Sequence, residues 1–227
     1  MMVRLLAFVE GPTEEKFIRE IVAPELHSRK IFITATTSGR KRYQGGVQRW
    51  SPVQRELLRY LKEDTGRFVT TMFDYYGMPT DWPGRDAARR QAYYRKAATV
   101  EKAMLEDISK AMGNAFNRQR FIPYVQMHEF EALLFSAPGI LGGVIPEQGI
   151  TDDLKSIADS FQTPEEIDDD PNTAPSKRIF RLSQRYQKVL HGNIAAQRIG
   201  LALMRQKCPH FNDWQTRLES LGQGNQT

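Results

Sequence analysis

The sequence predicts an α/β fold with a mainly parallel sheet flanked by helices, followed by a helical C-terminal region. Four short runs have the apolar or alternating character of β-strands: residues 3–9, 30–37, 67–73 and 120–127. Segments with the spacing of amphipathic helices separate the first three runs. Strands joined by helices form parallel sheets with right-handed crossovers, so the carboxyl ends of these strands are expected to share one rim.

The first two strands enclose a helix. The run VRLLAFV at 3–9 is typical of a strand that is buried on both faces. GPTEEKFIREIVAPEL at 11–26 then has helical periodicity, with Thr13 as the expected N-cap. KIFITATT at 30–37 alternates in hydrophobicity, which indicates the second strand.

The next elements repeat this alternation. SPVQRELLRYLKED at 51–64 opens with serine and proline, which mark the start of a helix. RFVTTMF at 67–73 follows as a strand that ends at Asp74. The stretch from about 86 to 112 has helical spacing, and RFIPYVQM at 120–127 is expected to be the last strand.

Length and composition limit the class of protein. The chain has 227 residues, 40% of them hydrophobic, which suits one full core and predicts an α/β domain over 1–150 with a helical region over 151–227 packed on it. No apolar stretch is long enough for a membrane span or has the form of a signal peptide. The single cysteine, Cys208, fits a reducing compartment, so we expect a cytoplasmic protein. The net charge of +5 permits an anionic partner such as nucleic acid.

Acidic side chains follow the predicted strands. Glu10 and Asp74 come directly after two strands, and Glu129 and Glu131 follow the last one. A carboxylate at the tip of a buried strand needs a positive partner, because an unpaired buried charge is costly. One interpretation is a site for divalent cations, since Mg²⁺ prefers hard oxygen ligands. The alternative is that each acid caps a helix or pairs with a Lys or Arg side chain.

Five short motifs in a fixed order resemble those of a known group of proteins. VEGPTEEKF, DYYGMP, QMHEFEALLF, APSKRI and CPHFNDW together resemble a prokaryotic family labelled as a domain of unknown function and regarded as Toprim-like. The first and second also resemble the Toprim domain of topoisomerases, primases and overcoming-lysogenisation-defect nucleases. The resemblance implies that Glu10 and Asp74 are metal ligands, completed by Glu131 and by Glu129 or Glu14.

The resemblance also implies a function. It suggests a nuclease that uses Mg²⁺ or Mn²⁺ to cleave phosphodiester bonds of DNA or RNA, in a phage-defence setting with an ATPase partner. The sequence has no GxxxxGK[ST] motif, so any use of ATP belongs to that partner. The alternative is a catalytically inactive Toprim-like subunit that binds nucleic acid or acts as a scaffold.

One position departs from the Toprim pattern. The Asp-x-Asp pair at the end of the third strand is here Asp74-Tyr75-Tyr76, and a phenol is a poor Mg²⁺ ligand at neutral pH. Glu131 or Glu129 is the expected replacement, and Asp81 is a weaker one. His128 is a candidate general base or outer ligand; alternatively, it is hydrogen-bonded at a helix start.

Two basic segments are candidates for contact with nucleic acid. Arg40, Lys41 and Arg42 lie in a glycine-rich loop that is expected to be irregular. Lys177 and Arg178 follow Ser176, the expected N-cap of a helix. Positive charge in the first turn opposes the helix dipole, so a bound phosphate would explain these two residues, and solvated side chains are the alternative.

Overall fold

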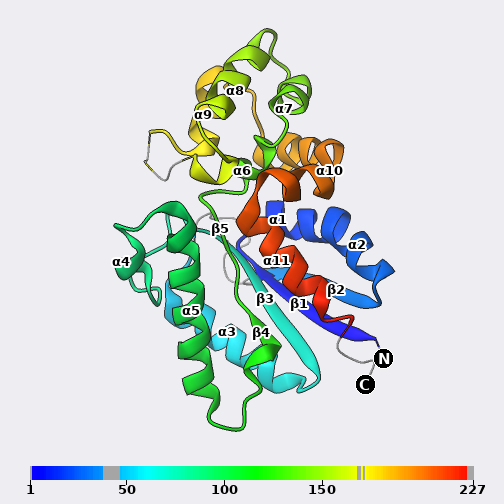
Figure 1. The fold of residues 1–227 in the computed structure, drawn as a ribbon, viewed down its shortest axis with the longest axis vertical. Coiled ribbons are helices and arrows are strands. Elements are labelled where there is room, and N and C mark those ends of the chain that lie inside the picture. Colours follow the sequence, from blue (N-terminus) through cyan, green and yellow to red (C-terminus); the bar gives the residue numbers. More distant parts are fainter. Residues whose placement is uncertain (1, 38–46, 168–169, 171, 224–227) are drawn as a thin grey trace.

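The computed structural model describes residues 2–37, 47–167, 170 and 172–223, and it confirms the α/β class (Figure 1). All strand pairs among these residues are parallel, in the order β2-β1-β3-β4, with β5 also paired to β3. The strands are β1 (Val3–Val9), β2 (Ile31–Thr37), β3 (Arg67–Asp74), β4 (Phe121–Ile122) and β5 (Val125–Gln126). Their carboxyl ends therefore lie along one rim, as expected from the sequence.

Helices cover both faces of the sheet and extend beyond its carboxyl rim, where Figure 1 shows α6, α7, α8 and α9. The helices between strands are α1 (Pro12–Phe17), η1 (Ile18–Val22), α2 (Ala23–Ser28), α3 (Trp50–Glu63), α4 (Arg85–Ala88), α5 (Tyr93–Met112) and η2 (Arg118–Arg120). Those after the sheet are α6 (Glu131–Leu134), α7 (Pro138–Val144), α8 (Ile150–Asp159), η3 (Pro164–Glu166), α9 (Pro175–Leu182), η4 (Lys188–Gly192), α10 (Asn193–Lys207) and α11 (Pro209–Ser220). Among the described helices, none combines the length and the apolar content of a membrane span.

Alternate residues of the central strand β1 point into two hydrophobic cores. Leu5 and Val9 pack with α1 and α2 and with the helices of the C-terminal half, whereas Leu6 and Phe8 pack with α3 and α5. This is the double burial that the continuous apolar run predicted. The core on the first side includes Trp214 of α11, whose indole N–H donates to Thr70 Oγ1 of β3 at 2.9 Å. The last helix therefore packs directly on the sheet; the division of the chain at residue 150 stays a prediction.

The strand predicted at 120–127 forms as two short pieces. Pro123 has no N–H to donate to a neighbouring strand, so the ladder is interrupted between β4 and β5. Threonine hydroxyls of β3 bridge the gap: Thr70 Oγ1 donates to Ile122 O at 2.6 Å, and Tyr124 N donates to Thr71 Oγ1 at 2.9 Å. The broken strand therefore stays aligned with β3 up to its carboxyl end.

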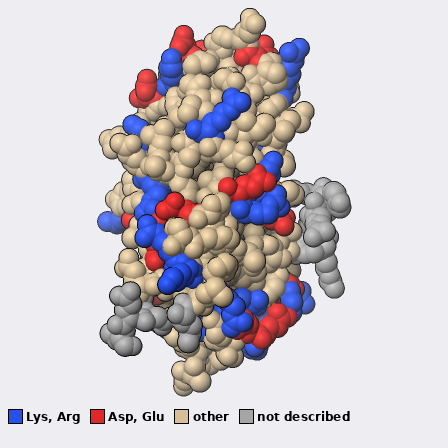
Figure 2. Space-filling view, turned by 90° about the vertical axis from the view of Figure 1, so that its right-hand side faces the viewer, with Lys and Arg blue, Asp and Glu red and all other residues tan. Residues whose placement is uncertain are grey.

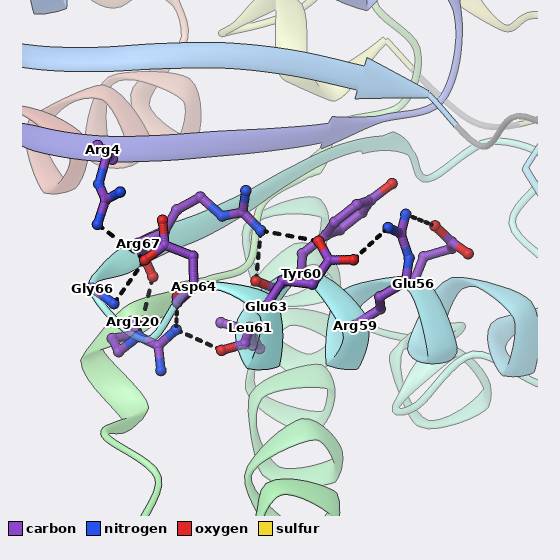
Figure 3. Close-up of polar contacts among 10 residues, drawn as sticks. All are labelled: Arg4, Glu56, Arg59, Tyr60, Leu61, Glu63, Asp64, Gly66, Arg67 and Arg120. Carbon is purple, nitrogen blue, oxygen red and sulfur yellow. Dashed lines mark hydrogen bonds and ion pairs between the residues drawn. The ribbon is translucent and has the colours of Figure 1, made fainter.

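The amino ends of the strands are tied to the end of α3 (Figure 3). The Arg120 guanidinium donates to Leu61 O and Asp64 O, each at 2.7 Å, and to Arg67 O at 3.1 Å. Arg4 of β1 pairs with the Asp64 carboxylate at 3.0 Å. The contacts to Leu61 O and Asp64 O serve carbonyl groups that the end of α3 leaves without a helical partner.

Candidate functional site

Glu10 and Asp74 meet at the carboxyl rim. Val9 of β1 pairs with Met72 of β3, and the Glu10 N–H continues the ladder by donating to Met72 O at 3.1 Å. The Glu10 carboxylate then accepts the Asp74 N–H at 3.1 Å. Asp74 is buried, and its Oδ1 has no hydrogen-bond partner among the described residues. Such an oxygen is costly unless it is protonated or binds a ligand.

Glu14 is a third acid close to this pair. It lies in the first turn of α1, is 6% exposed, and accepts the Gly11 N–H at 3.0 Å. Gly11 is the N-cap of this helix, so the expectation that Thr13 caps it is wrong. The reason is that the Glu14 side chain reaches back to the cap backbone and lets the helix start earlier. The motif resemblance gave Glu14 only as the alternative to Glu129, but its spacing of three residues from Gly11 is that of a capping box.

The three acids hold protons more tightly than isolated carboxyl groups. Burial raises the pKa of Glu10 to about 7, against the hydrogen bond from Asp74 and the charge of Lys188. Burial and the charge of Glu10 raise the pKa of Glu14 to about 8. Burial, then the charges of Glu10 and Glu14, raise the pKa of Asp74 well above its usual range. Desolvation and mutual repulsion therefore act together on this cluster.

Glu129 and Glu131 form a neighbouring group around Lys188. Lys188 Nζ lies 3.2 Å from Glu131 Oε1 and 3.6 Å from Glu129 Oε1. Burial acts to lower the pKa of Lys188, but the charges of Glu131 and Glu129 raise it, so the ammonium group stays charged. Glu129 also accepts the Ser176 N–H at 2.8 Å and its hydroxyl at 3.0 Å. The alternative of ion pairing thus accounts for part of this second group.

Lys188 is a candidate site residue that no sequence motif predicted. It lies in η4, more than fifty residues beyond Glu131, and no motif flanks it. Its charge lowers the pKa of Glu10, so its influence extends to the first group of acids. Only the tertiary fold brings it to the rim.

His128, Tyr76 and Asp81 occupy different positions around the rim. His128 is buried with its ring edge-on to Tyr75 at 5.8 Å, and its carbonyl accepts the Tyr76 N–H at 2.7 Å. The exposed Asp81 accepts the Trp50 N–H at 3.2 Å at the start of α3. It therefore serves a helix start, as strand-end acids often do.

The structure describes only some of the basic residues that were predicted from the sequence to bind nucleic acid. Arg40, Lys41 and Arg42 fall outside the described residues. Lys177 is exposed, whereas Arg178 donates to Thr173 O at 2.7 Å and lies over the Phe161 ring at 5.3 Å. Ser176 is not the N-cap of α9, because the helix starts at Pro175 after Ala174. The amide of Ser176 instead binds Glu129, which occupies part of the helix start where a phosphate was expected.

The donor chemistry suits a hard cation, but the ligands do not form a complete shell. Within the described part of the chain, no group of three or more His, Cys, Asp and Glu side chains is placed to hold a metal ion. The unpartnered Asp74 Oδ1 beside Glu10 fits Mg²⁺ or Mn²⁺, which use few carboxylates and keep several waters. Glu10 and Asp74 are the residues that would hold such an ion, with Glu14 beside them and with Glu129 and Glu131 on the Lys188 side.

The parallel sheet and the acidic side chains at its carboxyl rim define a mixed α/β protein with a candidate acid site. The chain belongs to the family described as Domain of unknown function (DUF4276), which it matches over residues 9–219. It is also similar to the C-terminal region of the OLD protein of Xanthomonas campestris pv. campestris, with 14% identity, 97% of each chain covered and a TM-score of 0.48. No curated protein matches the sequence.

Proposed function

We propose that the chain is a divalent-metal-dependent nuclease of the Toprim type that cleaves phosphodiester bonds of DNA or RNA. One observation carries the proposal: Glu10 and Asp74, from adjacent parallel strands, share a hydrogen bond at the carboxyl rim, while a buried Asp74 oxygen has no hydrogen-bond partner in the described part of the chain. Buried polar atoms normally have a hydrogen-bond partner, so a bound cation would satisfy this oxygen and would also favour the ionised form of Asp74. The motif resemblance described above supports the same class.

The side chains of the rim have separate roles in this proposal. A bound Mg²⁺ or Mn²⁺ would polarise the phosphodiester and help to ionise the attacking water. Glu10 and Asp74 bind the ion, while Glu14, with a pKa of about 8, can hold or release a proton near neutral pH. Lys188 stays charged and offers a cation to a phosphate oxygen or to the acids around it.

A second candidate function is an inactive Toprim-like subunit that binds nucleic acid or serves as a scaffold. Two observations favour it. Lys188 already pairs with Glu129 and Glu131, and Tyr76 stands where the Toprim pattern has its second aspartate. A lysine that neutralises the acids can replace a metal ion as the stabilising charge.

Cleavage assays separate the two functions. Purified protein is incubated with single- and double-stranded DNA and RNA in EDTA, Mg²⁺ or Mn²⁺. We expect metal-dependent cleavage that falls at least a hundredfold in Glu10→Gln, since removing the charge weakens metal binding. Glu15→Gln, the same substitution at a partly exposed position of α1, should cleave like wild type. Absence of cleavage with every metal and substrate would favour the inactive subunit.

We further propose an ATPase partner and a phage-defence setting, which rest on the motif resemblance alone. The sequence contains no GxxxxGK[ST] motif, so ATP hydrolysis would have to come from a second protein. ATP-dependent stimulation of cleavage by that partner would support this setting.

A further inference from the structure

Four arginines and two tyrosines gather on α4 and the start of α5. The sequence GRDAARRQAYYRK at 84–96 contains Arg85, Arg89, Arg90, Tyr93, Tyr94 and Arg95, which we call the α4–α5 surface. Arg89, Arg90 and Arg95 are exposed, and no ion pair joins them to an acid anywhere in the described residues. Asp86 is the one acid within this stretch. The stretch itself is therefore strongly positive, and the acids that act on it from elsewhere, Glu165 and Glu166, lie on the Tyr93 side.

An exposed aromatic ring lies among these charges. Tyr94 is 57% exposed, so its ring is not part of either hydrophobic core. Arg95 lies 5.7 Å from the Tyr94 ring, and the Tyr93 ring is edge-on to it at 5.7 Å. A ring with one open side, flanked by guanidinium groups, is the combination on which unpaired bases stack while phosphates are neutralised.

The α4–α5 surface contacts the residue that follows Asp74 at the carboxyl rim. Tyr75 directly follows Asp74, and Arg85 donates to the Tyr75 hydroxyl at 2.6 Å with its guanidinium 3.9 Å from the ring centroid. Gly84 adopts φ +74, and a Cβ there would meet Thr99 O of α5 at 2.8 Å. Only glycine allows the start of α4 to lie this close to α5, so the backbone of α4 is held against α5. Figure 1 shows α4 at the same end of the sheet as β5.

Other parts of the surface have a different charge pattern. Figure 2 shows the side of the molecule away from α4, where acidic and basic side chains lie next to one another in several places. Mixed charges of this kind give a solvated surface without a strong field of one sign. By contrast, residues 84–96 contain four arginines and a single acid.

We infer that the α4–α5 surface binds single-stranded nucleic acid and leads it toward Glu10 and Asp74. The inference rests on the proposed function and names the form of its substrate. Arg89, Arg90 and Arg95 contact phosphates, while Tyr94 stacks on a base. A duplex would satisfy the arginines equally well but has no unpaired base for the exposed ring, so an unpaired strand is the better match.

The test measures binding in EDTA, where cleavage cannot occur. Fluorescence anisotropy with a labelled oligothymidine and with a duplex of equal length is recorded over a series of salt concentrations. We expect tighter binding of the single strand. Arg89→Ala/Arg90→Ala should weaken it about tenfold and reduce the salt slope by about 1.4, the value for two lost phosphate contacts on a single strand. Tyr94→Ala should also weaken binding, and Tyr94→Phe should retain it.

Arg118→Ala/Arg217→Ala is the matched control, because it removes the same charge beside a groove at the amino end of the sheet. It should bind like wild type. An equal loss in this control, a preference for the duplex, or an unaffected Tyr94→Ala would overturn the inference. Binding without later cleavage in Mg²⁺ or Mn²⁺ would contradict the nuclease while leaving the α4–α5 surface supported, so the two proposals fail separately.

Discussion

At the scale of single residues, the pKa of Glu10 makes the stability of the metal-free protein depend on pH. Its pKa is about 7 in the folded chain and 4.5 in its ordinary state. As pH rises through this window, the unfolded chain releases the proton while the folded chain retains it, so folding stability falls and the loss is complete above about pH 7. The group therefore favours folding only at the acidic end of the range.

Glu10→Gln tests this pH dependence, because it removes the titrating group and keeps an oxygen that can accept the Asp74 N–H. In EDTA, we expect its melting temperature to be within a few degrees of wild type near pH 5 and to rise relative to wild type at pH 8. Glu15→Gln, measured by the same thermal unfolding, should show no such trend. If the melting temperature of Glu10→Gln did not rise relative to that of wild type with increasing pH, the raised pKa of Glu10 would be contradicted.

The candidate site could be predicted only in part from single residues. Glu10 and Asp74 were found because each directly follows a strand, and parallel strands end on one rim. Lys188 was not found, since it reaches the rim through the packing of η4 and has no local signal. The same applies to the partner of Glu129, because the sequence gives no sign that the Ser176 amide faces that carboxylate.

At the scale of elements, periodicity predicted strands and helices well where side-chain spacing alone decides the structure. It failed at two breaks. Pro123 divides the last strand, and the helix expected over 86–112 begins instead as α4, followed by α5 from Tyr93. Both breaks depend on how the backbone meets its neighbours, such as the close approach of Gly84 to α5. Binary patterns do not encode such contacts.

The role of Asp81 in starting α3 gives a prediction at this scale. Asp81→Ala removes the acceptor of the Trp50 N–H and should destabilise the fold by about 1 kcal/mol, or roughly 2–4 °C in melting temperature. Thermal unfolding measures the change. Asp213→Ala, an exposed aspartate within α11, is the matched control and should be nearly neutral. If Asp81→Ala lost metal binding while its melting temperature stayed unchanged, Asp81 would instead be a metal ligand.

At the scale of the whole molecule, three regions distant in sequence converge on the carboxyl rim. The first strand and helix bring Glu10 and Glu14, β3 brings Asp74, and the C-terminal helices bring Lys188. The α4–α5 surface borders the same rim through Tyr75 and Arg85. The fold thus places acids, a cation and a positively charged surface together, and the proposed function requires that the acids bind a divalent metal.

Calorimetric titration of the metal-free protein with Mn²⁺ at pH 7, in two buffers of different ionisation enthalpy, measures whether the acids bind a metal ion. Since Glu10 and Glu14 have pKa values of about 7 and 8, a bound ion should displace protons, and the apparent enthalpy should differ between the buffers. We predict binding with proton release in wild type, and at least tenfold weaker binding in Asp74→Asn. If wild type did not bind Mn²⁺, or bound it without proton release and with the same affinity as Asp74→Asn, metal binding by these acids would be contradicted.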